Sequence, residues 1–152
     1  EIGDTIQVSG YTGKVLVINL RSTEMREVDG RFVIIPNTEV FAKPIVNFTR
    51  APSRRIRIPL QIAIDTDLDL ATRRVFHALR AVTGFLEDPA PQLVLESFAN
   101  SVIQSTLLCW IDTTVVDYSN AQSAIAGAIA LAFKDAGIDM PSPTLEVSML
   151  EK

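Results

Sequence analysis

The first fifty residues contain no run of apolar side chains with a helical period, which excludes a helical fold for this part of the chain. Short segments rich in β-branched and apolar residues are separated there by turn-forming residues, Gly10-Tyr11-Thr12-Gly13 and Asp29-Gly30. We predict strands at residues 5–9, 14–20, 22–28 and 31–35, and a weaker one near 39–41. So many strands in so few residues cannot form separate layers with helices, so we expect a small, strongly bent barrel or sandwich.

The stretch from Thr23 to Asn37 predicts a hairpin that ends at a defined point. Asp29-Gly30 suits a tight turn whose central residues need positive φ. Pro36 has no backbone N–H and therefore ends the strand pairing, while the Asn37 side chain can bond nearby backbone. We interpret Asn37, and likewise Asn47 ten residues later, as residues that fix turns rather than bind ligands.

After a connector at residues 51–54 the pattern changes to alternating strands and helices. We predict a strand from residue 55 to 64, with Pro59 favouring an edge position, then a helix that ends near Gly84. Two strands follow at 92–98 and 102–111, then a second helix that ends at Gly137 and a last strand at 144–150. Capping boxes are predicted at the two helix starts, formed by Thr66 with Asp69 and by Ser119 with Gln122. The order βαββαβ is typical of the ferredoxin-like arrangement.

Composition narrows the functional classes. Apolar residues make up 47% of the 152 residues and charged residues 21%, which indicates a packed globular protein of one domain or two small ones. No apolar run is long enough to span a membrane, so the chain as given is expected to be soluble. The net charge of −4 disfavours general binding to nucleic acid. The single cysteine, Cys109, lies in an apolar run and is expected to be buried, in a reducing compartment.

Catalytic and metal-binding patterns are weak. His77, the only histidine, has no evident nucleophile partner. The run Asp65-Thr66-Asp67-Leu68-Asp69 has the carboxylate spacing of a calcium loop, but Leu70 and Phe76 stand where that loop needs glycine and glutamate. No Cys/His cluster or phosphate-binding loop is present. We therefore predict no catalytic residues, no metal and no cofactor, and we expect Trp110 to pack in the core.

Several short motifs together resemble one known family, the small-conductance mechanosensitive channels. The motifs occur in the family's order and spacing: Gly3-Asp4-Thr5-Ile6, Gly13-Lys14-Val15, Thr23-Glu24-Met25-Arg26, Asp29-Gly30, Ile35-Pro36-Asn37, Asn47-Phe48-Thr49-Arg50, Asp65-Thr66-Asp67, and the stretch from Phe133 to Pro141. The resemblance covers nearly the whole chain.

This resemblance implies an Sm-like five-stranded β-domain at residues 1–50 and a ferredoxin-like αβ-domain at residues 55–152, joined by the linker at 51–54. In the family, seven subunits build a hollow cage with side portals on the cytoplasmic side of the bacterial inner membrane, below a pore for ions and small osmolytes. The transmembrane helices of the family are missing here, so we expect a soluble vestibule fragment of a longer protein that meets the membrane only through those N-terminal helices.

The sequence leaves open which residues line the portals and whether the chain has another function. Portal-lining charges would bias which ions pass, and Arg54, Arg55, Asp65 and Asp67 are candidates by their position near the domain junction. The alternative function is a soluble regulatory module that senses a small molecule with its ferredoxin-like half, for which no glycine-rich loop is visible. A small acyl-phosphate hydrolase would need an anion-binding arginine at the first strand-to-helix junction, which is acidic here.

Overall fold

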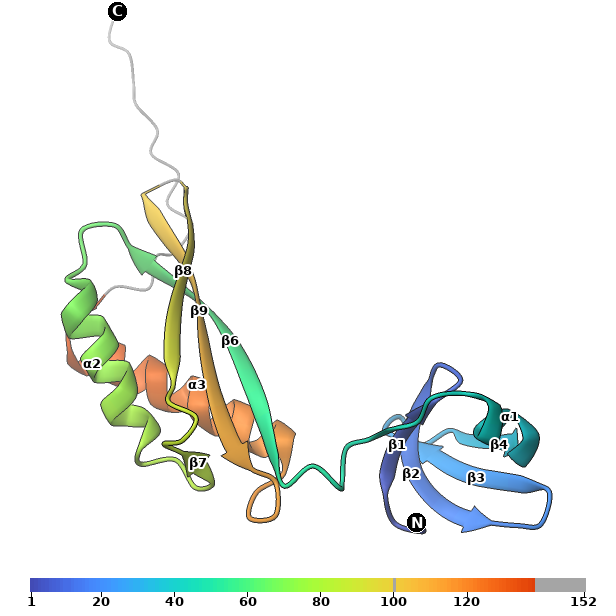
Figure 1. Cartoon of the computed structure of the whole chain (residues 1–152). Helices are drawn as coiled ribbons and strands as arrows, with labels where there is room; N and C mark the ends of the chain where they lie inside the picture. The colour runs from blue at the N-terminus through green and yellow to red at the C-terminus, as the bar shows by residue number, and fades with distance from the viewer. Residues whose placement is uncertain (100, 139–152) are drawn as a thin grey trace, which may run out of the picture. The chain divides into compact units, whose positions relative to one another are not determined.

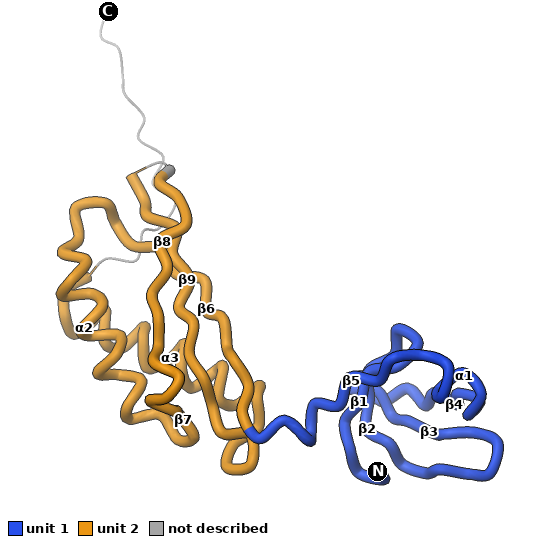
Figure 2. The backbone as a smooth tube through the Cα atoms, in the orientation of Figure 1, with its two compact units in different colours: residues 1–52 blue, residues 53–152 orange. Residues whose placement is uncertain are grey.

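The computed structural model describes residues 1–99 and 101–138. The chain divides into two compact units, unit 1 (residues 1–52) and unit 2 (residues 53–152) (Figure 2). Each has its own sheet and its own hydrophobic core. Among these described residues, no helix has both the length and the apolar character needed to cross a bilayer.

Unit 1 is built on one antiparallel sheet with the strand order β4-β3-β2-β1-β5. The strands are β1 (Thr5–Val8), β2 (Tyr11–Ile18), β3 (Ser22–Glu27), β4 (Phe32–Pro36) and β5 (Val46–Asn47). β2 is visibly curved in Figure 1, and its register with β3 shifts between Val15 and Val17. The curvature lets the strands enclose a small core, which consists of Ile6, Val8, Val15, Met25 and Ile35.

The strand predicted near residues 39–41 is wrong. These residues lie in a short helix, α1 (Asn37–Ala42), and the fifth strand is β5. Pro36 precedes the helix with φ −56° and cannot continue the ladder, since it has no N–H. Lys43 Nζ lies 2.6 Å from Glu39 Oε1, an (i, i+4) pair that supports a helical turn.

The hairpin predicted between residues 23 and 37 is present as the β3–β4 pair, with residues 28–31 as its loop. Gly30 has φ +92°, but Asp29 does not share this left-handed conformation. Asp29 instead accepts hydrogen bonds from the Arg31 backbone N–H at 3.2 Å and from Arg31 Nε at 2.7 Å. The hydrogen bond from the Arg31 backbone N–H, and then the one from its side chain, lower the pKa of Asp29. The loop is therefore longer than a two-residue turn and is closed by the aspartate side chain.

Unit 2 contains a sheet on which two helices pack (Figure 1). Its elements are β6 (Ser53–Ala63), α2 (Leu68–Leu79), β7 (Phe85–Leu86), β8 (Gln92–Ala99), β9 (Val102–Asp112) and α3 (Tyr118–Asp135). β9 is central: it pairs antiparallel with β6 on one side and with both β7 and β8 on the other. Ser53 and Arg54, expected in the linker, are the first residues of β6.

Alternate residues of the two long strands supply the core of unit 2. β6 contributes Ile56, Ile58, Leu60 and Ile62, and the helices contribute apolar residues that include Val75, Leu79, Ile125, Ile129 and Phe133. On β9 the buried core positions are Ile103, Leu107, Cys109 and Ile111. Because neighbouring residues of a strand face opposite ways, Trp110 faces away from this core. It is half-buried and outside the core cluster, so the prediction that it packs in the core is wrong.

Both predicted capping boxes are wrong, although both helices exist. Asp67 caps α2, accepting from the N–H groups of Asp69 and Leu70, each at 3.0 Å. Asp117 caps α3 in the same way. A carboxylate two residues before the free N–H groups can accept two bonds at once and also interacts favourably with the helix dipole.

The helix ends differ in how well they follow the sequence. α2 ends at Leu79 rather than near Gly84, and β7 follows it unpredicted. Gly137 has φ +66°, and the Ile138 N–H bonds the Phe133 carbonyl at 2.9 Å, which confirms the predicted glycine stop of α3. The strand predicted at 144–150 lies outside the described residues.

Candidate functional site

Asn37 connects the start of α1 to the β2–β3 turn. Its Oδ1 accepts from the Thr23 hydroxyl at 2.8 Å, and its Nδ2 donates to the carbonyls of Asn19 at 2.9 Å and Leu20 at 3.2 Å. Every polar atom of the side chain amide is therefore engaged in the scaffold. With Pro36 ending β4 beside it, this residue fixes where the sheet stops and the helix begins.

Asn47 has a similar arrangement where the chain leaves unit 1. Its Oδ1 accepts from the N–H groups of Thr49 at 3.0 Å and Arg50 at 2.9 Å, while its Nδ2 donates to Asp4 Oδ2 at 2.8 Å. Arg50 Nε also lies 3.7 Å from Asp4 Oδ2. These contacts tie the exit of unit 1 to its first strand, so the direction of the chain after Asn47 is set within the unit.

The four candidate portal residues do not form one cluster. Arg54 and Arg55 open β6, whereas Asp65 and Asp67 follow its end, so about 30 Å of extended strand separates the two pairs. Arg54 lies over the Tyr118 ring, with its guanidinium carbon 4.1 Å from the centroid, and Arg55 is exposed opposite Trp110. Asp67 caps α2 and Asp65 is exposed. Only the arginines therefore lie beside the boundary of unit 2.

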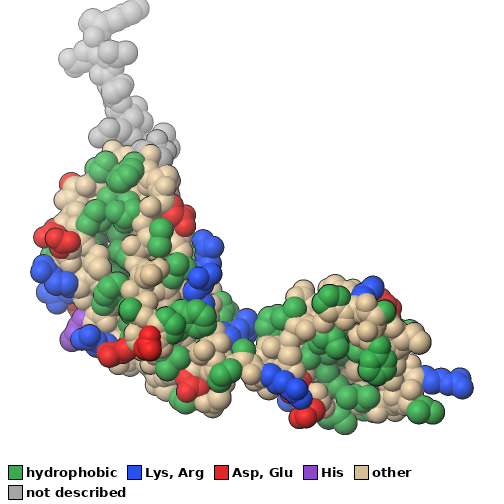
Figure 3. Space-filling model, viewed as in Figure 1, with side chains coloured by type: hydrophobic (Ala, Val, Ile, Leu, Met, Phe, Trp, Pro, Cys, Tyr) green, Lys and Arg blue, Asp and Glu red, His purple; other side chains and the backbone are tan. Residues whose placement is uncertain are grey.

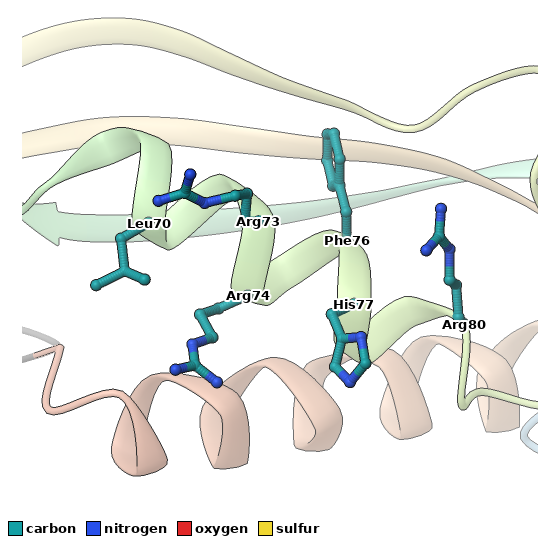
Figure 4. A pocket seen from close by; sticks show the side chains of 6 residues that line it. All are labelled: Leu70, Arg73, Arg74, Phe76, His77 and Arg80. Atoms are coloured by element: carbon teal, nitrogen blue, oxygen red, sulfur yellow. The ribbon is translucent and has the colours of Figure 1, made fainter.

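α2 carries a basic surface, which we call the arginine face and which the sequence patterns did not predict. It consists of Arg73, Arg74, His77 and Arg80, all exposed, together with Leu70 and Phe76. These residues line a hollow of about 570 Å³. Figure 4 shows Arg73, Phe76 and Arg80 extending to one side of the helix and Leu70, Arg74 and His77 to the side of α3. Figure 3 shows basic side chains gathered along this edge of unit 2.

The arginine face continues into a shallow groove between α2 and α3. Arg74 and His77 border it, Asp135 stands on α3, and its apolar lining is small, except for Leu131, which is 60% exposed. The remaining lining residues are Ala78, Ala81, Ala128 and Ala132. Small side chains let the two helices approach closely, as expected from the alanine content of α3.

The part of the chain that the structure describes contains no group of side chains arranged as a metal site. Within residues 1–99 and 101–138 no three His, Cys, Asp or Glu side chains come together as a metal site. His77 stands on the arginine face among cationic side chains, not beside a nucleophile. What the geometry offers is two well-fixed small domains with charged surfaces, which suits a structural or binding role.

Comparison with protein families agrees with this two-unit architecture. Residues 1–50 match the family described as "Mechanosensitive ion channel, beta-domain", and residues 56–140 match "Mechanosensitive ion channel MscS, C-terminal". The fold and these matches define a protein of the mechanosensitive ion channel class, which is a class of channels and not of enzymes. Within that class, the chain belongs to the MscS family, as its motifs predicted.

Individual relatives agree over almost all of the chain. It is 27% identical to the small-conductance mechanosensitive channel of Edwardsiella ictaluri over 149 residues, which are 98% of the chain and 51% of that protein. In structure it resembles closed-state MscS of Helicobacter pylori, with a TM-score of 0.87 and 23% identity, over all of this chain and 60% of that one. Arabidopsis thaliana MSL1 gives a TM-score of 0.74 at 26% identity, over 93% of this chain and 53% of that one. The chain thus spans about half the length of these relatives.

Proposed function

We propose that this chain is the cytoplasmic vestibule of a mechanosensitive channel subunit, which releases solutes on hypo-osmotic shock. The observation that carries the proposal is the ordered pair of family matches, at residues 1–50 and 56–140. In this role the chain acts in subunit assembly and in filtering ions and small osmolytes, and the pore lies in another part of the protein.

The proposal includes the finer fold of both domains. The strand order β4-β3-β2-β1-β5 supports an Sm-like β-domain at residues 1–50. Pairing of β9 with both β6 and β8 is the order of the first three strands of a ferredoxin-like αβ-domain, assigned to residues 55–152 with a linker at 51–54.

Assembly into a homo-oligomer, a heptamer in the full-length channel, is the next part of the proposal. Exposed apolar side chains on both edge strands of unit 1 support it: on β4, Phe32 is 67% and Ile34 66% exposed, and on β5, Val46 is 48% exposed. Unpaired edges with apolar side chains favour contacts with another chain.

Light scattering with mass determination on the isolated chain tests whether the vestibule assembles without its membrane part. A mass of seven chains supports cage contacts that suffice by themselves. A monomer at high concentration makes assembly depend on the membrane-spanning region and contradicts cage contacts that suffice by themselves.

Expression of the full-length protein in cells that lack their own mechanosensitive channels tests the function. The proposal predicts rescue of survival after hypo-osmotic shock and tension-gated currents in membrane patches. Normal membrane expression without currents or rescue would overturn it. The alternative, a small-molecule-sensing regulatory module, is not favoured by the family matches.

A further inference from the structure

The arginine face of α2 concentrates positive charge on one helix of an acidic chain. The net charge of the protein is −4, yet Arg73, Arg74 and Arg80 lie within two turns of one helix, with His77 between them. Arg80 follows the last residue of α2 as its C-cap, where a cation interacts favourably with the helix dipole. The dipole does not account for Arg73 and Arg74, which lie in the middle of the helix.

Neither of these two arginines is neutralised in the described part of the chain. Among residues 1–99 and 101–138, no ion pair involves Arg73 or Arg74, whereas Arg80 Nε lies 2.9 Å from Glu87 Oε1. The Arg80–Glu87 pair is exposed on both sides, at 67% and 69%, so water screens it and it is weak. As far as the described residues go, the face therefore presents two guanidinium groups without an ion pair and a third that an incoming anion can recruit.

The dimensions of the face favour an elongated anion. At 1.5 Å rise per residue, Arg73 and Arg80 are separated by about 10 Å along α2, with Arg74 and His77 between them. A guanidinium group donates two parallel hydrogen bonds to a phosphate, which gives it an advantage over a point charge. The hollow between these side chains is shallow and open to solvent, so an anion can reach the guanidinium groups directly.

We infer that the arginine face is a binding site for linked phosphate groups, of the kind carried by inorganic polyphosphate or by a nucleoside triphosphate. Arg73 and Arg80, which Figure 4 shows on the same side of α2, hold the two ends of the anion, Arg80 after exchanging Glu87 for it, and Arg74 binds it from the adjacent side of the helix. The site lies within one chain, so it depends neither on the channel assignment nor on the assembly of subunits.

Titration calorimetry of the chain with sodium tripolyphosphate, with ATP and with citrate tests the inference. We expect tripolyphosphate to bind one site per chain and to weaken several-fold as ionic strength rises to a physiological level. Binding of ATP at similar affinity identifies the phosphate chain as the shared determinant, and binding of tripolyphosphate alone identifies inorganic polyphosphate as the source. Absence of binding by both phosphate probes at low ionic strength, or equal binding of citrate, would overturn the inference.

Variants locate the site. The double change Arg73→Gln and Arg74→Gln should weaken tripolyphosphate binding by roughly tenfold or more, because two charge-assisted contacts are lost. Arg55→Gln, which removes an exposed arginine from β6, is the matched control and should leave binding unchanged. An equal loss in both proteins would contradict the assignment to α2. Circular dichroism and the thermal midpoint check that each variant is folded.

Glu87→Gln provides a test with the opposite sign. Removing this carboxylate frees Arg80, so tripolyphosphate should bind several-fold more tightly. A general electrostatic attraction would respond equally to Asp65→Asn, which removes one negative charge after β6. Equal gains from both changes would therefore count against a defined site.

Discussion

Two aspartates determine where the helices of unit 2 begin. Asp67 and Asp117 each accept hydrogen bonds from two backbone N–H groups at the start of a helix. The first N–H groups of a helix have no carbonyl one turn earlier to accept from them, so the side chain of the preceding residue must supply an acceptor. Asp67, one of the candidate portal charges, thus has a structural role at the start of α2.

Replacing Asp67 by alanine should lower the free energy of unfolding by about 1 kcal/mol, because two N–H groups lose their acceptor. Urea denaturation followed by circular dichroism measures the change. Asp65→Ala removes an exposed carboxylate two residues earlier and should change stability by less than about 0.5 kcal/mol. Equal effects of the two substitutions would mean that the cap does not stabilise α2.

Cys109 should be nearly inert in the folded protein. Its side chain is fully buried, and burial raises the pKa of the thiol to about 11. In the unfolded chain the thiol pKa is about 8.5, so at neutral pH the reactive thiolate is roughly 300-fold scarcer in the folded state. The raised pKa also means that its contribution to stability is complete below about pH 8.5 and is lost as the pH rises toward 11.

Alkylation by iodoacetamide, followed by mass spectrometry, measures this reactivity. We expect slow modification of the native chain and fast modification in urea, with a native rate that increases steeply above pH 9. Fast native modification near pH 8 would show that the β9 core opens readily.

At the scale of elements, the connection from α2 to β9 depends on Gly84. Its φ is +80°, and a Cβ at this position would overlap Cγ1 of Val116 and lie 3.4 Å from the Asp112 carbonyl oxygen. The Asp112 N–H in turn bonds the Gly84 carbonyl at 2.8 Å. Only glycine lets the backbone approach this closely, and β7 can then pair with the end of β9.

Gly84→Ala should therefore destabilise the protein by about 2 kcal/mol, from left-handed backbone strain and overlap with Val116. Gly127→Ala is the matched control in the exposed middle of α3, where a Cβ meets open space. It should stabilise by about 0.5–1 kcal/mol, because alanine is the better helix former. Thermal unfolding should separate the two variants in opposite directions, and a shift of the same sign in both would refute this explanation.

Period and punctuation in the sequence predicted most of the elements. Alternation identified β6 and β9, helical spacing identified α2 and α3, and Asp29-Gly30 identified the β3–β4 hairpin. Residues 39–41 were misassigned because a short run carries too little pattern to separate a strand from one turn of helix. The two-residue strand β7 was missed since tertiary pairing with β9 creates it.

The candidate site was less predictable from sequence than the fold. Proximity in sequence placed Asp65 and Asp67 near the domain junction, but β6 is extended and carries them to its far end. The spacing of Arg73, Arg74, His77 and Arg80 was a usable signal, since it leaves all four on the exposed surface of one helix. Nothing in the sequence indicates that Arg73 and Arg74 form no ion pair within the described residues while Arg80 pairs with Glu87, because pairing depends on side-chain placement.

At the scale of the whole molecule, the charge beside the boundary of unit 2 should influence permeation in the full-length channel. Arg55 is exposed on β6, so Arg55→Glu replaces a positive by a negative charge without loss of packing. If this position lines a portal, cation permeability should rise relative to that of anions. Reversal potentials in salt gradients, recorded from membrane patches, measure the shift.

Asp65→Asn, at the other end of β6, is the control for this experiment, and a smaller shift is expected for it. An unchanged reversal potential for Arg55→Glu would show that β6 does not begin at a portal.

The central position of β9 affects how the protein folds during its synthesis on the ribosome. β6 pairs with β9 from Ala63 opposite Val102 to Ser53 opposite Asp112. The partner of each β6 residue therefore lies 39 to 59 positions later in the chain. In unit 1 the sequence separation is shorter for the first four strands, because each pairs with the next strand in the chain. Distant pairings close slowly. During synthesis, unit 1 can therefore fold while the apolar face of β6 stays exposed until β9 has been made. Exposed apolar surface favours aggregation, so we expect chaperones to bind the nascent chain mainly in this interval.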